Sequence, residues 1–113
     1  MKGTILLVDD RANKYMIEVL EEELGFLVCR YYDGRGAIRD IQDNLKYQLA
    51  LVDLSLPDIS GEDVIEVSKE VNPDVPVIGI SAFGYKPKKA DKYVSKTQAE
   101  ELLKVIESYF KQK

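Results

Sequence analysis

Short runs of consecutive apolar residues, separated by stretches with helical periodicity, constrain the fold of this chain more than any other feature. The runs do not alternate polar with apolar residues, so they predict strands that are buried on both faces, as in a parallel sheet. Four runs are clear and a fifth is weaker; they occupy residues 5–8, 26–28, 49–52, 75–80 and 93–94.

Apolar residues three and four positions apart predict a helix in each of four spaces around these strands. The marker residues are Ile17, Leu20 and Leu24; Ile38, Ile41 and Leu45; Val64, Val67 and Val71; and Leu103, Ile106 and Phe110. Local signals mark the ends: Gly25 as a stop, Asp33 before the second helix, Ser60 as a cap and 97–100 as a capping box. The alternation predicts one α/β domain over residues 1–113, with helices on both faces of the sheet.

The segment between the fourth and fifth strands breaks this alternation. A parallel crossover needs about a dozen residues, and this segment has barely that many. Gly84 and Pro87 also interrupt any helix within it. We therefore expect at most one helical turn there, followed by a tight return to the fifth strand.

Composition excludes several kinds of chemistry. The 113 residues include no His, which removes His-based nucleophilic pairs, His metal ligands and phosphohistidine formation on this chain. The single cysteine, Cys29, cannot form an internal disulfide and favours a reducing, cytoplasmic location. A net charge of −4 argues against direct binding to nucleic acid or to an anionic membrane, and no apolar run reaches the length of a membrane span.

Acidic residues follow two of the predicted strands at the point where each strand ends. Asp9 and Asp10 come directly after the first run, and Asp53 comes after the third. If these strands are neighbours, three carboxylates meet at one edge of the sheet, and their repulsion favours a bound hard cation such as Mg²⁺. The plainer alternative is that each aspartate only caps a helix or a turn.

Three further polar residues lie at the same predicted edge. Ser81 ends the fourth strand, Lys96 follows the fifth, and Tyr93 lies three residues before that lysine. Ser81 could hydrogen-bond an anion there and Lys96 could neutralise a phosphate. Taken singly, the serine is typical of a loop, the lysine of a solvated surface and the tyrosine of ordinary packing.

As a set, and in this order, these residues resemble the receiver domain of two-component response regulators. The matching segments are residues 7–10, 52–57 with Gly61, 81–82 and 93–96, and the resemblance extends from Ile5 to Phe110. It implies a flavodoxin-like, doubly wound sheet of five parallel strands in the order 2-1-3-4-5. The fourth helix of the family would be shortened or absent here.

The resemblance also implies a role for each residue. Asp53 would accept a phosphoryl group from a histidine kinase or a histidine phosphotransfer protein. Mg²⁺ would be held by Asp10, Asp53 and the backbone carbonyl of Ser55, with Asp9 as an outer or water-mediated holder. Lys96 would pair with the phosphoryl group, and Ser81 and Tyr93 would be the switch residues. Such a domain is a signalling module that can promote its own phosphorylation and dephosphorylation, not a dedicated enzyme.

Beside the shortened helix, a second departure from the family pattern stands out. The family usually has Pro after its lysine, whereas this chain has Thr97, so we expect a trans bond with a shifted loop or a strained exception. The unusual crossover carries four lysines: Lys86, Lys88, Lys89 and Lys92. They form either a solvated surface or a docking patch for an acidic partner.

Three functions are consistent with these residues. The leading one is a phospho-accepting receiver that signals to an unknown downstream protein by protein–protein contact, or passes the phosphoryl group on. The second is a non-catalytic interaction module with a remodelled surface over residues 82–92. The third, a Mg²⁺-dependent phosphatase with an aspartyl-phosphate intermediate, ranks lowest because Asp53-Leu54-Ser55 lacks the second carboxylate of an Asp-x-Asp pair.

Overall fold

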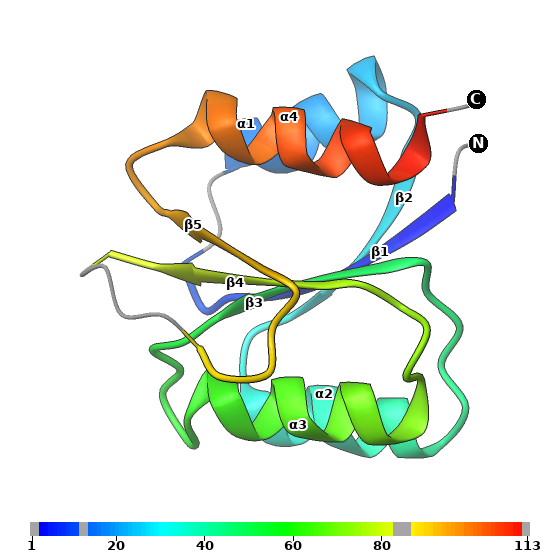
Figure 1. Ribbon diagram of the computed structural model, residues 1–113, viewed down its shortest axis with the longest axis vertical. Coiled ribbons are helices and arrows are strands. Elements are labelled where there is room, and N and C mark those ends of the chain that lie inside the picture. Colours follow the sequence, from blue (N-terminus) through cyan, green and yellow to red (C-terminus); the bar gives the residue numbers. More distant parts are fainter. Residues whose placement is uncertain (1–2, 12–13, 83–86, 112–113) are drawn as a thin grey trace.

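Figure 1 shows the computed structural model, which describes residues 3–11, 14–82 and 87–111. Its central layer is a parallel sheet of five strands in the order β2-β1-β3-β4-β5, so the predicted order is confirmed. In chain order the elements are β1 (Gly3–Val8), α1 (Lys14–Glu18), the π-helical turn η1 (Val19–Glu23), β2 (Phe26–Tyr31), α2 (Gly34–Gln42), β3 (Leu49–Asp53), α3 (Gly61–Val71), β4 (Val77–Ser81), β5 (Lys92–Ser95) and α4 (Ala99–Phe110).

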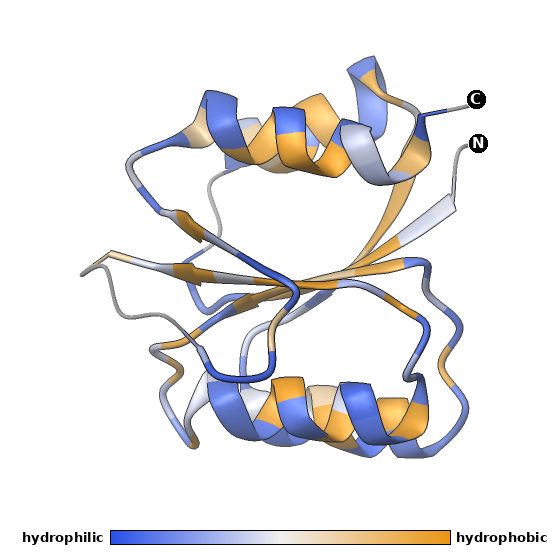
Figure 2. Cartoon of the chain, in the orientation of Figure 1, coloured by the Kyte–Doolittle hydropathy of each residue, from blue (hydrophilic) through white to orange (hydrophobic). Residues whose placement is uncertain are grey.

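Helices cover both faces of the sheet. In Figure 1, α1, η1 and α4 lie on one side of the strands, and α2 and α3 lie on the other. Successive residues of β1 alternate between two cores: Ile5 and Leu7 pack with the α4 side, whereas Leu6 and Val8 pack with the α2–α3 side. The central strands are largely orange in Figure 2, and the helices turn blue faces away from them. Burial on both faces explains why the strands are continuous apolar runs.

The predicted helix ends are mostly confirmed. The Asp33 side chain accepts a hydrogen bond from the Gly36 N–H, and the Ser60 hydroxyl accepts one from the Glu62 N–H. Gly25, which follows η1, has a φ of 78°, a left-handed conformation that glycine adopts without strain.

The predicted capping box at the start of the last helix is wrong. The helix α4 begins at Ala99, and its N-cap is Gln98, which makes no side-chain capping bond. Thr97 interacts instead with Ser95: the two hydroxyls lie 3.0 Å apart, and the Thr97 N–H donates to the Ser95 hydroxyl at 3.3 Å. Hydroxyl side chains hydrogen-bond readily to nearby groups outside a helix, and here that local bond competes with capping.

The segment between β4 and β5 is the one whose expected form departs from the β–α alternation. No described residue between β4 and β5, namely Ala82 and 87–91, is helical, while Gly84 lies outside the described residues. The ring of Pro87 lies against Gly79 of β4, where an added Cβ would be 2.6 Å from a ring carbon. Ala90 packs against the core on the α2–α3 side. The described residues of the crossover therefore cover this part of the sheet without a helix.

Charged side chains fasten this loop to α3 and β4. The Asp91 carboxylate accepts hydrogen bonds from the Val77 N–H at 2.7 Å and from the Lys69 ammonium at 2.9 Å. Lys89 forms an ion pair with Glu66 at 2.8 Å, and the Lys88 N–H donates to Glu62 at 3.0 Å. Of the predicted lysine patch, Lys89 is thus paired within the chain and Lys86 lies outside the described residues.

Two other features are relevant to the sequence analysis. No cis peptide bond occurs in the described part of the chain, so the Lys96–Thr97 bond is trans. None of the helices among the described residues is long and apolar enough to cross a membrane.

Candidate functional site

Three carboxylates gather at the carboxyl ends of β1 and β3. The two strands are neighbours in the sheet, with Val8 beside Val52, so the residues that follow them meet at one edge. Asp9, Asp10 and Asp53 each offer an oxygen within 4.8 Å of the others. Asp53 is only 2% exposed and Asp9 6%, whereas the Asp10 side chain is 29% exposed. The predicted cluster is therefore present, and two of its members are buried.

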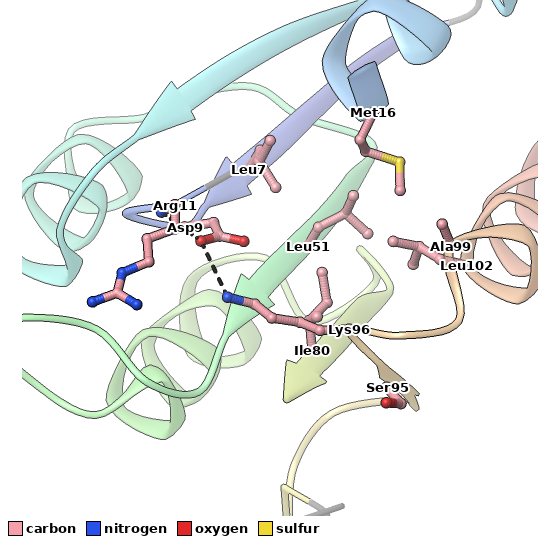
Figure 3. A pocket seen from close by; sticks show the side chains of 10 residues that line it. All are labelled: Leu7, Asp9, Arg11, Met16, Leu51, Ile80, Ser95, Lys96, Ala99 and Leu102. Carbon is pink, nitrogen blue, oxygen red and sulfur yellow. Dashed lines mark hydrogen bonds and ion pairs between the residues drawn. The ribbon is translucent and has the colours of Figure 1, made fainter. Parts of the chain in front are cut away.

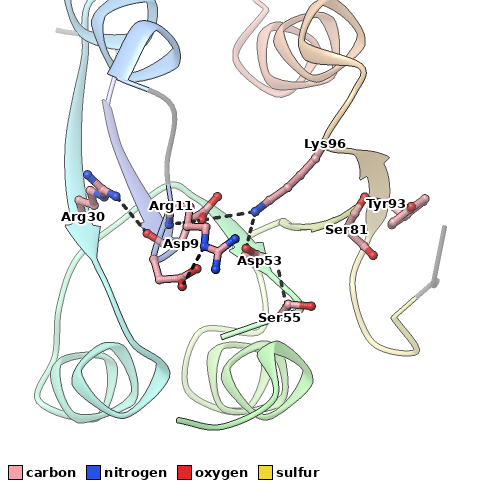
Figure 4. A network of polar contacts seen from close by, with 9 residues as sticks. Asp9, Arg11, Arg30, Asp53, Ser55, Ser81, Tyr93 and Lys96 are labelled. Carbon is pink, nitrogen blue, oxygen red and sulfur yellow. Dashed lines mark hydrogen bonds and ion pairs between the residues drawn. The ribbon is translucent and has the colours of Figure 1, made fainter. Parts of the chain in front are cut away.

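Lys96 supplies a positive charge inside this cluster (Figure 4). Its Nζ lies 2.7 Å from Asp53 Oδ2 and 3.6 Å from Asp9 Oδ1. Burial opposes the charge of the ammonium, but the hydrogen bond to Asp53 and the charges of Asp9 and Asp53 outweigh it and raise the pKa of Lys96. The lysine therefore stays charged at neutral pH and holds the position predicted for it.

The environment of Asp9 disfavours the charged form of its carboxyl group. Burial raises its pKa above the ordinary value, and the nearby charge of Asp53 adds to the shift. The backbone N–H of Arg11, 2.8 Å from Asp9 Oδ1, acts in the opposite direction. A carboxylate in this environment is stabilised in its charged form when a further cation enters the site.

The donor set fits a hard divalent cation. Carboxylate oxygens at this spacing are the ligands that Mg²⁺ prefers, and they belong to three adjacent acids that one lysine does not neutralise. Ser55, the other predicted ligand, lies beside them, since its N–H donates to Asp53 Oδ1 at 2.9 Å.

The loop after β3 is closed tightly upon itself. The Gly61 N–H donates to the Leu54 carbonyl at 3.1 Å, and Ser55 forms an antiparallel bridge with Ser60. A side chain at position 61 would overlap the Asp53 carbonyl oxygen and would lie 2.7 Å from the Leu54 Cα. Glycine is therefore required there for α3 to begin against the residue that ends β3.

Of the predicted switch residues, Ser81 is the last residue of β4 and Tyr93 lies within β5, beside Gly79. Ser81 is 5% exposed, and its carbonyl oxygen accepts hydrogen bonds from the Lys96 N–H at 3.0 Å and from the Tyr93 hydroxyl at 3.4 Å. Figure 4 shows Tyr93 on the side of Ser81 that faces away from Asp53. Ser81 thus lies between the acidic cluster and the half-buried tyrosine.

An apolar cavity of about 130 Å³ adjoins the charged groups (Figure 3). Its walls include Leu7, Leu51 and Ile80 from the strands, and Asp9 and Lys96 border it. This lining surrounds two of the charged side chains with apolar surface, which strengthens their electrostatic interaction.

Two residues near the site carried no clear sequence signal. The Arg30 guanidinium donates to the Asp9 carbonyl oxygen at 3.3 Å and stacks on Tyr32 at 4.1 Å. Asp58 binds the start of α2. In the sequence Arg30 lies just beyond an apolar run, and Asp58 follows a proline as turn residues often do, so neither stands out from its neighbours.

Comparison with known proteins identifies the family. The family model for the response regulator receiver domain matches residues 5–107, and the chain therefore belongs to this family. It is a signalling domain of two-component systems, not a dedicated enzyme. Receiver domains bind Mg²⁺ at an acidic pocket and interact with histidine kinases and downstream effectors.

Among individual relatives, the regulatory protein LuxO of Vibrio vulnificus is 46% identical over 52 residues, which cover 43% of this chain and 12% of LuxO. The match thus spans about an eighth of that longer protein. A CheY-like receiver domain protein of Methanospirillum hungatei superposes with a TM-score of 0.83 at 26% identity, covering 95% of this chain and 92% of that one. The response regulator TrrA of Thermotoga maritima, solved in complex with Mg²⁺-BeF, gives 0.76 at 28% identity, covering 94% and 97%.

Proposed function

We propose that Asp53 accepts the phosphoryl group, from a phosphohistidine of a histidine kinase or of a histidine phosphotransfer protein. The observation that carries this proposal is the pairing of a buried Asp53 with Lys96 at 2.7 Å, at the edge of the sheet where two more carboxylates gather. The Asp53 side chain is held at both oxygens, by Lys96 and by the Ser55 N–H, so it is oriented before any donor arrives.

The transfer is a displacement at phosphorus. A carboxylate oxygen of Asp53 forms the new P–O bond while the P–N bond of the phosphohistidine breaks. The departing ring nitrogen keeps the electron pair of the P–N bond, and with a proton on the other ring nitrogen the ring leaves as neutral imidazole. The product on this chain is an acyl phosphate. Since residues 1–113 contain no His, the donor histidine lies outside them.

The cation site is proposed on the same residues. Asp10, Asp53 and the Ser55 backbone carbonyl would hold Mg²⁺, and Asp9 would hold it through water. When bound, the ion offsets the charge of the incoming phosphoryl oxygens. The TrrA structure, which contains Mg²⁺-BeF, supports this assignment by its similarity to the present chain.

Lys96, Ser81 and Tyr93 are proposed to respond to the phosphoryl group. The Lys96 ammonium would pair with a phosphoryl oxygen, and the Ser81 hydroxyl would turn toward another. Because the Ser81 carbonyl accepts from both the Lys96 N–H and the Tyr93 hydroxyl, movement at Ser81 would also reach the tyrosine. Phosphorylation would in this way bias an equilibrium between two arrangements of these residues.

The output of the domain is proposed to be protein–protein contact, or onward transfer of the phosphoryl group. We propose residues 1–113 as one receiver domain with an unidentified downstream protein and no direct contact with nucleic acid or membrane. A reducing compartment, the cytoplasm, suits its single cysteine, Cys29.

Mass spectrometry after incubation with acetyl phosphate tests this proposal. We expect the wild-type chain to gain one phosphoryl group in the presence of Mg²⁺, and we expect no gain in Asp53→Asn or after chelation of the metal. Asp74→Asn, an exposed acid outside the site, is the matched control and should react as the wild type does. A wild-type chain that forms no adduct would favour the non-catalytic interaction module, and continuous turnover of phosphoesters would favour the phosphatase.

A further inference from the structure

We propose that Asp58 is a positioning residue: it fastens the loop that contains Ser55 to the start of α2, and this contact maintains the affinity of the site for Mg²⁺. The inference rests on the magnesium site proposed above and assigns it a supporting residue outside the acidic cluster.

The contacts of Asp58 join two segments that are far apart in the sequence. Its Oδ1 accepts from the Gly34 N–H and from the Ile59 N–H, each at 2.9 Å, and its Oδ2 accepts from the Arg35 N–H at 2.9 Å. The Gly34 N–H, followed by those of Arg35 and Ile59, lowers the pKa of Asp58 against the opposing effect of burial. The carboxylate therefore bridges the β3–α3 loop and the first turn of α2.

Capping of α2 does not by itself explain the contacts that Asp58 makes. A local residue, Asp33, already caps α2 by accepting from the Gly36 N–H at 2.8 Å. Gly34 is buried beneath Ile59, and an added Cβ would lie 2.5 Å from the Ile59 Cγ1. The loop thus contacts α2 in two ways: Asp58 makes the polar contact and Ile59 makes the apolar one.

The same loop leads directly to the acidic cluster. Its base is closed by the Ser55–Ser60 bridge and tied to Asp53 by the Ser55 N–H. Asp58, between these two serines, fixes the outer part of the loop. If that contact is lost, the loop gains freedom and the Ser55 carbonyl is no longer held in advance of the ion. Loss of residues that support metal ligands typically weakens metal affinity about 10- to 100-fold.

A pair of variants separates positioning from helix capping. Asp58→Ala removes the bridge, whereas Asp33→Ala removes a cap of the same helix and leaves the loop attached. The Mg²⁺ dissociation constant of each full chain is measured by titrating MgCl₂ against the ¹⁵N NMR signals of Asp10 and Ser55. We expect Asp58→Ala to bind Mg²⁺ about tenfold more weakly than the wild type. We expect the dissociation constant of Asp33→Ala to lie within about twofold of the wild-type value. Both variants should lower the urea midpoint of unfolding, because each removes a carboxylate that accepts hydrogen bonds at the start of α2.

Phosphorylation kinetics provide an independent measurement. With acetyl phosphate as donor, the Mg²⁺ concentration for half-maximal rate should rise about tenfold in Asp58→Ala, while the rate at saturating Mg²⁺ stays within about twofold. Asp58→Asn keeps one acceptor oxygen, and its half-maximal Mg²⁺ concentration should fall between those of the wild type and Asp58→Ala. Gly34→Ala pushes Ile59 away with Asp58 intact, so it should weaken Mg²⁺ binding as well, and it serves if Asp58→Ala does not fold.

The outcomes are distinct. Unchanged Mg²⁺ affinity in Asp58→Ala, or equal losses in Asp58→Ala and Asp33→Ala, would overturn the positioning role and leave the proposed magnesium site intact. A wild-type chain whose Asp10 and Ser55 signals do not respond to Mg²⁺ would overturn the magnesium site itself.

Discussion

Asp53 is held more completely than a surface carboxylate. One oxygen accepts from Lys96 at 2.7 Å, the other accepts from the Ser55 N–H at 2.9 Å, and only 2% of the residue is exposed. Hydrogen bonds to a charged group in such surroundings are strong. Under the proposed function, a phosphoryl group on Asp53 would displace one of these partners, and Lys96 is the one that could follow the new charge. The proposed response would thus begin with a single exchange of partners.

Tyr31 provides a test of one partly buried polar contact at the residue scale. Its hydroxyl donates to Asp40 at 2.6 Å; burial, with this hydrogen bond and the charge of Asp40, raises the pKa of Tyr31 to about 12. Because the folded value lies above the ordinary value of 10.0, the stabilisation is complete below pH 10 and is lost as pH rises toward 12. We expect Tyr31→Phe to remove a tyrosinate transition near pH 12 from the ultraviolet absorbance titration and to flatten the loss of stability between these pH values.

The largely exposed Tyr15 gives the control for this prediction, since Tyr15→Phe also deletes one phenol. That variant should keep the late transition and the steep loss of stability. If Tyr31→Phe keeps the transition near pH 12 too, the high pKa belongs to another tyrosine.

At the scale of elements, residues 87–91 of the crossover from β4 to β5 are held against the sheet without forming a helix. Pro87 packs on Gly79, and Asp91 holds the loop against the first residue of β4. The N–H of Val77, a fully buried residue, has Asp91 as its acceptor. The loop is therefore anchored by a buried hydrogen bond and not only by its exposed lysines.

The contrast between this buried hydrogen bond and the exposed ion pair of Lys89 predicts unequal effects of two substitutions in the same loop. Asp91→Ala leaves the Val77 N–H without its acceptor and removes the carboxylate partner of Lys69, which keeps only the Val75 carbonyl oxygen. We expect it to lower the free energy of unfolding by about 1–3 kcal/mol. Lys89→Ala removes an ion pair between side chains that are 58% and 51% exposed, and we expect a much smaller loss, because solvent screens the pair. Urea denaturation of the two variants measures both values.

Asp91→Asn retains an acceptor oxygen and should fall between Asp91→Ala and the wild type. Equal losses in Asp91→Ala and Lys89→Ala would mean that the loop is held by its surface charges.

For the molecule as a whole, the acidic cluster links metal binding to stability. The folded chain brings Asp9, Asp10 and Asp53 within 4.8 Å of one another, whereas the unfolded chain separates Asp53 from the other two. A ligand that binds only the folded state stabilises it by about 2.7 kcal/mol at 100 times its dissociation constant. We therefore expect the Tm to rise progressively with added MgCl₂, and to return to its starting value when the metal is chelated.

Asp10→Asn is the matched variant for this prediction, because it removes a proposed ligand from the least buried position of the cluster. Its Tm should respond much less to Mg²⁺. A rise in Tm that is equal in Asp10→Asn and the wild type would show that the metal acts elsewhere on the chain.

Most of the fold and the acidic cluster could be predicted from local patterns. Continuous apolar runs marked β1, β3 and β4, and aspartates after two of these runs predicted where charge would gather. The start of α4 was predicted wrongly, because Thr97 has an alternative partner in Ser95 that a capping motif does not reveal. Asp58 and Arg30 were missed since their partners, Gly34 and Asp9, lie more than twenty residues away.

The sequence by itself determined the layered α/β sheet, the strand ends that carry Asp9, Asp10, Asp53, Ser81 and Lys96, and the absence of room for a full helix before β5. These properties depend on periodicity, burial and chain length, which are read along the chain. Only the tertiary structure decided that Lys96 lies between Asp9 and Asp53, that Asp91 secures the crossover and that Asp58 joins the β3–α3 loop to α2. Each of these contacts unites segments whose proximity is created by the packing of the sheet and its helices, and no local pattern records it.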